Sequence, residues 1–194
     1  MNMRLAYDSV DSYQLLDHAD APDDILIRSY AAVIANYSDP HGKVFVPALG
    51  LSMPIFRGLL AVYFSRFTAP LPWLYEQSTP LGDQGALAEF TDLLQLLLDN
   101  RAVDDEHHRC FAHLVATACM GNDHLWQDLG LPDRTALSML LHNHFPYLAL
   151  KNTGEMKWKK FFYKQLCERE EILVCKAPSC AVCADYSKCF GPEV

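Results

Sequence analysis

The chain has 194 residues, of which 51% are hydrophobic and 21% charged, as in an ordinary globular protein. That length is enough to bury one sizeable core. The formal net charge of −8 argues against a general nucleic-acid-binding protein, because such proteins present a basic surface.

The N-terminal sequence predicts neither a secretion signal nor a membrane anchor. Acidic residues begin at Asp8, and no apolar segment of the kind found in signal peptides precedes it. No apolar run reaches the roughly 20 residues that a membrane-spanning helix needs. We therefore expect a cytoplasmic protein, in which seven cysteines favour metal binding over disulfides.

Helical spacing of apolar residues dominates the first half of the chain. We expect residues 1–20 to be a poorly ordered N-terminal extension. A helix is predicted to begin near Pro22, and Ser52 is a candidate N-cap for a second helix. Several turn-forming residues predict a loop over 68–82, and apolar spacing predicts a third helix over 84–99.

The second half continues this pattern. A helix is predicted from about Asp104 to Met120, a short one within 123–130, and another capped by Asp133 and interrupted by Pro146. A final amphipathic helix is expected over about 155–170. No strand-like alternation persists, so we predict an all-α fold. A single helical domain over 21–170 would be followed by a cysteine-rich, cluster-binding tail over 171–194.

The tail holds four cysteines with the spacing Cys-x4-Cys-x2-Cys-x5-Cys, namely Cys175, Cys180, Cys183 and Cys189. Thiolates this close together in the sequence are suited to zinc, copper(I) or an iron–sulfur cluster. Structural zinc sites usually combine two Cys-x2-Cys pairs, and only one is present here. The first three cysteines follow the Cys-x4-Cys-x2-Cys run of plant-type ferredoxins. The spacing therefore favours an iron–sulfur-type cluster over zinc, and both over disulfides or free thiols.

Three other residues are candidates for an additional metal ligand. Cys167 precedes the motif by eight residues, although a buried, structural thiol is the simpler interpretation. His144 and His124 are the histidines that we single out, while most histidines of this chain are expected on the surface or in the core. Cys110 and Cys119 lie in an apolar helical pattern and are interpreted as core residues.

A basic segment leads into the cysteine motif. Residues 1–150 carry 8 basic and 18 acidic side chains, whereas residues 151–176 carry 7 basic and 4 acidic ones. Lys157, Lys160 and Lys164 are spaced for one helix face. This face is either ordinary solvated surface, a contact for an acidic partner, or an electrostatic guide for an oxyanion.

The chain offers no sequence motif of a common enzyme class. We find no nucleotide-binding glycine-rich loop, no Gly-x-Ser-x-Gly turn and no paired-carboxylate hydrolase site. The sequence therefore gives no support to a hydrolase or a kinase, and we expect a protein that is not an enzyme.

Three stretches together resemble the NifQ family of nitrogen-fixation proteins. They are residues 156–167, which read MKWKKFFYKQLC, the cysteine motif with the following Phe190-Gly191, and residues 124–131, which read HLWQDLGL. The sequence His144-Phe145-Pro146 is similar to the same family. The likeness spans roughly residues 45–192, and the cysteine motif is its most specific part.

This resemblance implies a protein that processes molybdenum and donates it to assembly of the nitrogenase iron–molybdenum cofactor. Molybdate would be the source, and a molybdenum–iron–sulfur cluster would be held by the four tail cysteines. The implied partners are the cofactor-maturation scaffold and the nitrogenase iron protein, with no nucleic acid or membrane involved. The alternatives are an iron–sulfur module for electron transfer or oxygen sensing without molybdenum, and a zinc-stapled interaction module.

Overall fold

The computed structural model describes residues 11–37, 46–68, 84–171 and 186–193. Across these ranges the regular structure is entirely helical, with no strand, which confirms the all-α prediction for them. The chain divides into two compact units, Met1–Leu87 and Ala88–Val194. No described helix is long and apolar enough to cross a membrane.

Unit 1 is built around helix α2, Ile25–Tyr37. The short helix α1, Ser12–Leu16, packs against it, and a 3-10 turn at Pro47–Gly50 contacts both α2 and α3, Met53–Tyr63. The ring of Tyr30 in α2 stacks on Tyr63 in α3 at 5.2 Å. Helix α1 lies within the segment expected to be an N-terminal extension, and its Leu15 is fully buried.

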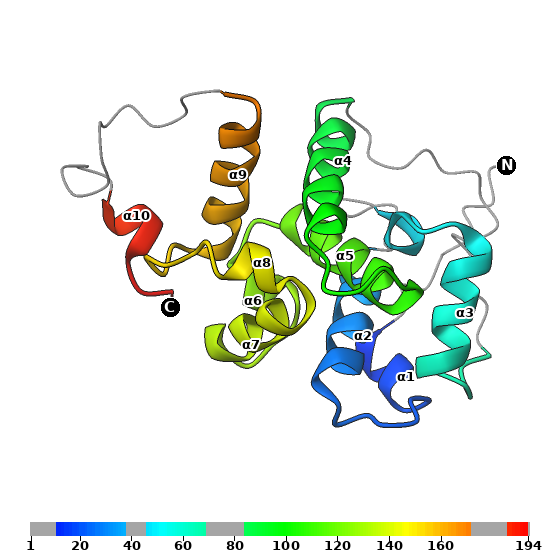
Figure 1. Ribbon diagram of the computed structural model, residues 1–194. Coiled ribbons are helices and arrows are strands. Elements are labelled where there is room, and N and C mark those ends of the chain that lie inside the picture. The colour runs from blue at the N-terminus through cyan, green and yellow to red at the C-terminus, as the bar shows by residue number, and fades with distance from the viewer. Residues whose placement is uncertain (1–10, 38–45, 69–83, 172–185, 194) are drawn as a thin grey trace, which may run out of the picture. The chain divides into compact units, whose positions relative to one another are not determined.

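Unit 2 contains the remaining helices, which Figure 1 labels from α4 to α10. The division between the units falls inside the first turn of α4. The helices are α4 (Gln84–Asp99), α5 (Glu106–Cys119), α6 (Leu125–Asp128), α7 (Arg134–His144), α8 (Pro146–Ala149), α9 (Trp158–Arg169) and α10 (Tyr186–Phe190).

Helix α5 forms the centre of unit 2. Its residues from Cys110 to Cys119 are buried with the exception of His113, so this helix is apolar on nearly all sides. It packs on α6, which contacts α7, and α7 turns directly into α8. Helix α9 buries Trp158, Phe161 and Phe162, and its remaining residues are more exposed.

The helix ends show which sequence signals acted as expected. Asp105 and Asp133 each accept a hydrogen bond from the backbone amide three residues later, at 2.8 and 2.9 Å. Pro146 ends α7 as predicted and occupies the first turn of α8. Ser52 occupies the N-cap position of α3, but its side chain makes no capping hydrogen bond.

Candidate metal site and lysine cavity

Cys189 is the one motif cysteine within the described residues. It lies on α10, is half-buried and forms no disulfide. Cys175, Cys180 and Cys183 fall outside the described residues. In the described ranges, no three histidine, cysteine, aspartate or glutamate side chains are placed to hold a metal ion. The four-thiolate site therefore stays a prediction, and the described structure shows how its last member is positioned.

Backbone and ring contacts hold α10 against the segment before α9. The amide of Lys157 donates a hydrogen bond of 2.8 Å to the carbonyl of Cys189. Within α10 itself, the rings of Tyr186 and Phe190 stack at 4.5 Å. A Cβ atom at Gly154 would lie 3.3 Å from the Phe190 ring, so a glycine at this position allows the close approach.

Gly191 closes α10 by a close backbone approach. Its amide donates a hydrogen bond of 2.8 Å to the carbonyl of Ser187. A Cβ atom at this position would lie only 2.3 Å from that same oxygen. The Phe-Gly pair that follows Cys189 in the sequence therefore has a steric reason for its glycine.

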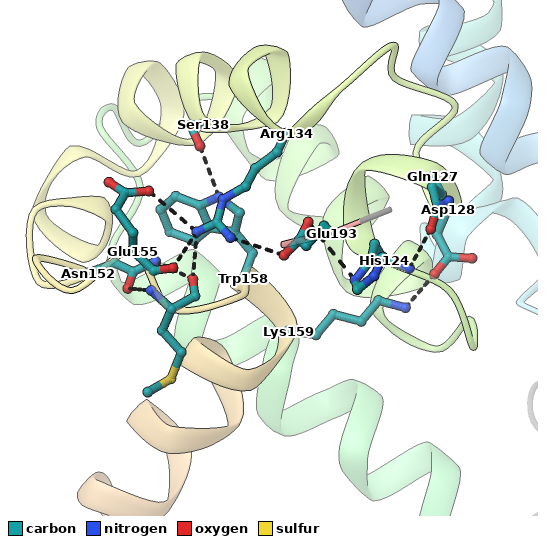
Figure 2. Close-up of polar contacts among 11 residues, drawn as sticks. His124, Gln127, Asp128, Arg134, Ser138, Asn152, Glu155, Trp158, Lys159 and Glu193 are labelled. Carbon is teal, nitrogen blue, oxygen red and sulfur yellow. Dashed lines mark hydrogen bonds and ion pairs between the residues drawn. The ribbon is translucent and has the colours of Figure 1, made fainter. Parts of the chain in front are cut away.

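Arg134, at the start of α7, joins the C-terminal end of the chain to the loop before α9 (Figure 2). Its guanidinium donates hydrogen bonds to the carbonyls of Glu155 and Met156, at 2.8 and 3.0 Å. It also forms an ion pair of 3.2 Å with Glu193, whose side chain is only 4% exposed. We call these contacts, together with the Lys157–Cys189 hydrogen bond, the α10 anchor.

The loop that receives Arg134 is shaped by Asn152. This buried amide side chain accepts a hydrogen bond from the Met156 amide at 2.9 Å and donates one to the Met156 carbonyl at 2.8 Å. Between them, Glu155 adopts a positive φ of 54°. The Met156 carbonyl thus accepts hydrogen bonds from both Asn152 and Arg134, which fixes the backbone immediately before α9.

The first turn of α9 is tied to α6 and α7. Lys159 donates hydrogen bonds to the carboxylate of Asp128, on α6, and to the carbonyl of Gly121 at 2.8 Å. The indole nitrogen of Trp158 donates to the hydroxyl of Ser138 on α7 at 3.1 Å (Figure 2). Because these contacts use buried or half-buried groups, they set the position of the start of α9.

A cavity of about 410 Å³ opens beside this first turn of α9. Its charged lining consists of four lysines, Lys157, Lys159, Lys160 and Lys188, and two acidic residues, Asp123 and Glu193. Asn122, His124 and Trp158 also line it. We call it the lysine cavity. Lys188 directly precedes Cys189, so the cavity adjoins the helix that carries the last motif cysteine.

The structure separates the three lysines that the sequence grouped together. Lys157 occupies the N-cap position of α9, and it lines the lysine cavity together with Lys160. Lys164 does not line the cavity and instead forms an ion pair of 3.5 Å with Glu168 one turn later. Lys157 and Lys160 therefore share one local environment, and Lys164 belongs to another.

The two candidate histidines have different surroundings. His124 lines the lysine cavity, and its Nδ1 lies 4.0 Å from the Glu193 carboxylate. His144 is buried against Phe111, with ring centroids 4.0 Å apart. His107 and His108 lie close to it, at 5.2 and 5.1 Å between ring centroids. His144 therefore belongs to a group of three histidines together with His107 and His108 of α5. His124 instead lies in the lysine cavity, next to Glu193.

His144 is held in its neutral form. Burial, with smaller contributions from the neighbouring His107 and His108, lowers its pKa from 6.5 to about 4. Its Nδ1 has no hydrogen-bond partner among the described residues. His108, by contrast, bonds to the Asp105 carboxylate at 2.7 Å.

The three cysteines outside the motif also differ in their surroundings. Cys110 and Cys119 are buried in α5, and burial raises the pKa of these thiols to about 11 and about 12. Both therefore stay protonated and behave as core residues, as interpreted from the sequence. Cys167 is half-buried on α9, and among the described residues it belongs to no group of three potential metal ligands.

Sequence reasoning missed Arg134, Asn152 and Glu193. Arg134 reaches partners 21, 22 and 59 positions away, and such separations leave no periodic signal. Glu193 lies only four residues beyond Cys189, so its position next to the motif was the available hint. Lys188, inside the motif, could have been grouped with the basic segment on the same ground.

Comparison with known sequences places the chain in a family. The sequence profile of NifQ matches residues 29–191, which includes α2 to α10 nearly complete and all four motif cysteines. This chain belongs to the NifQ family. No solved structure matches the chain.

Individual NifQ proteins match shorter stretches. The chain is 51% identical over 106 residues to protein NifQ of Azotobacter vinelandii, covering 55% of this chain and 54% of that protein. It is 41% identical over 145 residues to a NifQ homologue of Sinorhizobium fredii, covering 74% and 61%. Protein NifQ of Klebsiella pneumoniae is 42% identical over 80 residues, covering 41% and 48%. The matches therefore span about half to three-fifths of these relatives.

Proposed function

We propose that this NifQ-family protein carries molybdenum in an iron–sulfur cluster and donates it to assembly of the nitrogenase iron–molybdenum cofactor. Cys175, Cys180, Cys183 and Cys189 would hold the cluster. The protein would act as a carrier of its cargo and not as an enzyme. Molybdate would supply the molybdenum.

The single observation that carries this proposal is the four-cysteine motif inside the segment matched by the family profile. Thiolates are soft ligands that suit iron–sulfur clusters. Molybdate is coordinated by oxygen, whereas molybdenum in the cofactor is bound by sulfur. A cluster supplies sulfide ligands at which this exchange of ligands can take place.

The surroundings of Cys189 fit an anionic cluster. The thiol is half-buried, and the neighbouring residue Lys188 lines a cavity in which lysines outnumber carboxylates. Nearby positive charge offsets the negative charge of a sulfide cluster. The α10 anchor holds the backbone at Cys189 through hydrogen bonds and an ion pair with other residues of the chain.

The recipients that we propose are the cofactor-maturation scaffold and the nitrogenase iron protein. Lys164 is exposed on the outer part of α9, beyond the lysine cavity. Its location suits contact with an acidic partner surface better than contact with an ion in the cavity. Reversing Lys164 to Glu is expected to slow transfer to a partner and to leave the metal content unchanged.

Elemental analysis tests the proposal directly. The full chain is purified without oxygen from molybdate-supplied cells, and its molybdenum, iron, zinc and sulfide are measured. Iron and sulfide together with molybdenum support the carrier function. The matched control is the Cys180→Ser variant, which is expected to lose iron, sulfide and the molybdenum bound in the cluster.

Two other results would replace the proposal. Iron and sulfide without molybdenum, even after reconstitution, would indicate a module for electron transfer or oxygen sensing. Zinc without sulfide would indicate a zinc-stapled interaction module, since such a site needs only thiolates.

A further inference from the structure

We propose that the lysine cavity binds a divalent tetrahedral oxyanion through Lys157 and Lys160. The cavity geometry and charge carry this inference, and only the choice of molybdate as the relevant anion rests on the proposed function. The site would hold the incoming oxyanion beside α10, before its metal reaches the cysteines.

The charge of the lining is the first argument. The cavity is lined by four lysines and two acidic residues in a chain whose formal net charge is −8. Glu193, one of the two, is neutralised by Arg134 at 3.2 Å. An acidic protein repels anions over most of its surface, so a locally basic concave site would concentrate them there.

Lys157 and Lys160 supply the uncompensated part of this charge. Lys159 is committed to Asp128 and to the Gly121 carbonyl. Neither Lys157 nor Lys160 has a carboxylate partner in the part of the chain that the structure describes. Two lysines that line one cavity can therefore turn toward an anion without first breaking an ion pair.

The start of α9 adds hydrogen-bond donors at the same place. Lys157 is the N-cap residue, and it provides no capping hydrogen bond through its side chain. Within the described ranges, the backbone amides of Trp158, Lys159 and Lys160 have no acceptor. A 12-residue helix presents partial positive charge at this end, which adds to that of the two lysines.

The cavity lies beside the helix that carries the last motif cysteine. Lys188, on its lining, is the neighbour of Cys189. The backbone amide of Lys157, a lining residue, is hydrogen-bonded to the carbonyl of Cys189. This bond links the lining of the cavity directly to the last motif cysteine. An oxyanion held here would lie beside the helix that carries Cys189, one of the four cysteines of the proposed cluster.

The test uses the full chain carrying Cys175→Ser and Cys183→Ser, so that no cluster contributes to binding. Molybdate binding is measured by equilibrium dialysis and calorimetry at two salt concentrations, with sulfate and phosphate as competitors. In this background, Lys157→Gln with Lys160→Gln is compared with Lys164→Gln, which keeps the same helix and changes a lysine outside the cavity. Circular dichroism confirms that each variant is folded.

We expect the Lys157 and Lys160 double variant to bind molybdate about tenfold or more weakly, because each ammonium–oxyanion hydrogen bond is charge-assisted. Lys164→Gln should bind as the parent does, and higher salt should weaken binding in the parent. Equal molybdate affinity in the double variant and the parent would overturn the proposal. So would the absence of saturable binding.

The proposed function is judged separately, by the molybdenum, iron and sulfide content of the wild-type chain. If the double variant keeps its molybdate affinity but, with all four motif cysteines restored, transfers molybdenum poorly to a recipient, these lysines form a protein-docking surface and the oxyanion site is rejected. If the oxyanion binds and wild-type protein never contains iron or sulfide, the cavity proposal stands and the cluster proposal falls.

Discussion

Arg134 shows how much of the candidate site depends on one side chain. It contacts two carbonyls in the loop before α9 and the carboxylate of Glu193. That carboxylate is 4% exposed, so it would be poorly solvated without a cation beside it. Arg134 is therefore a positioning residue for α10, acting through backbone and ion-pair contacts.

Replacing Arg134 with Gln should lower the free energy of unfolding by about 2 kcal/mol, because Glu193 is left as a buried, poorly paired charge. Adding Glu193→Gln should recover part of this loss, with a coupling free energy of about 1–3 kcal/mol in the double-mutant cycle. Urea unfolding of the wild type, the two single variants and the double variant measures this coupling free energy. Arg109→Gln is the matched control, since its ion pair with Asp104 is exposed and should matter little. A zero coupling energy would show that Arg134 and Glu193 act independently.

His144 gives the fold a dependence on pH. Its pKa is 6.5 when exposed and about 4 in the fold, so the unfolded chain takes up a proton first as the pH falls. The stabilisation is complete above about pH 6.5 and is lost progressively down to about pH 4, by up to about 3 kcal/mol. The nearby titrating groups are His107, His108 and Asp105.

Unfolding of the wild type and of His144→Phe at pH 7.5 and pH 5 checks this expectation. The wild type should lose more stability between the two values than the variant, which has no proton to take up at this position. His142→Gln serves as the control, since His142 is exposed on the same helix. An identical loss in wild type and His144→Phe would mean that other groups carry the acid sensitivity.

Helix α10 is the element on which the position of Cys189 depends. It has only five residues, and no residue in it is buried. So short a helix is not stable by itself, and the α10 anchor and the Gly191 turn replace the packing that longer helices have. Its stability is thus set by a few identifiable contacts.

Gly191→Ala should disturb α10, since its Cβ would lie 2.3 Å from the Ser187 carbonyl and the backbone must shift. We expect faster amide hydrogen exchange over residues 186–191 and weaker retention of bound iron under a chelator. Gly58→Ala is the matched control, because a Cβ there meets no atom within 4 Å and alanine favours a helix by about 0.5–1 kcal/mol. Unchanged exchange in Gly191→Ala would show that α10 tolerates the shift.

The elements also show what the sequence could and could not predict. Helices α2, α4 and α5 carry long apolar periods, and their spacing predicted them within a few residues. The five-residue helices α1 and α10 complete little more than one turn, which is too short for a period to show. The lysine spacing predicted a shared face for Lys157 and Lys164, but α9 begins only after Lys157, so this residue lies at its end.

At the scale of the whole molecule, the described end of the cysteine tail, residues 186–193, contributes no buried hydrophobic residue to the core. The buried hydrophobic residues of the described ranges run from Leu15 to Phe162, and none comes from residues 186–193. The core of each unit therefore does not rest on the described end of the tail. This agrees with an arrangement in which a folded scaffold displays a metal-binding segment.

Cys180→Ser or Cys183→Ser should therefore remove iron and sulfide while leaving the helical circular dichroism signal within a few per cent of wild type. Cys119→Ser is the contrasting variant. It places a hydroxyl in a site that is 3% exposed, and should lower stability by about 1–3 kcal/mol without a direct effect on metal content. A collapse of helical signal in the Cys180 or Cys183 variant would show that the metal site is structural.

The hydrogen bond between Lys157 and Cys189 links the position of α10 to the fluorescence of the neighbouring Trp158. Trp158, the next residue, is 3% exposed and bonded to Ser138, so its indole has one defined environment. Displacement of α10 would pull on the backbone immediately before that indole. The difference in fluorescence between wild type and Trp158→Phe therefore gives a built-in reporter of events at Cys189, readable in real time and without any attached label.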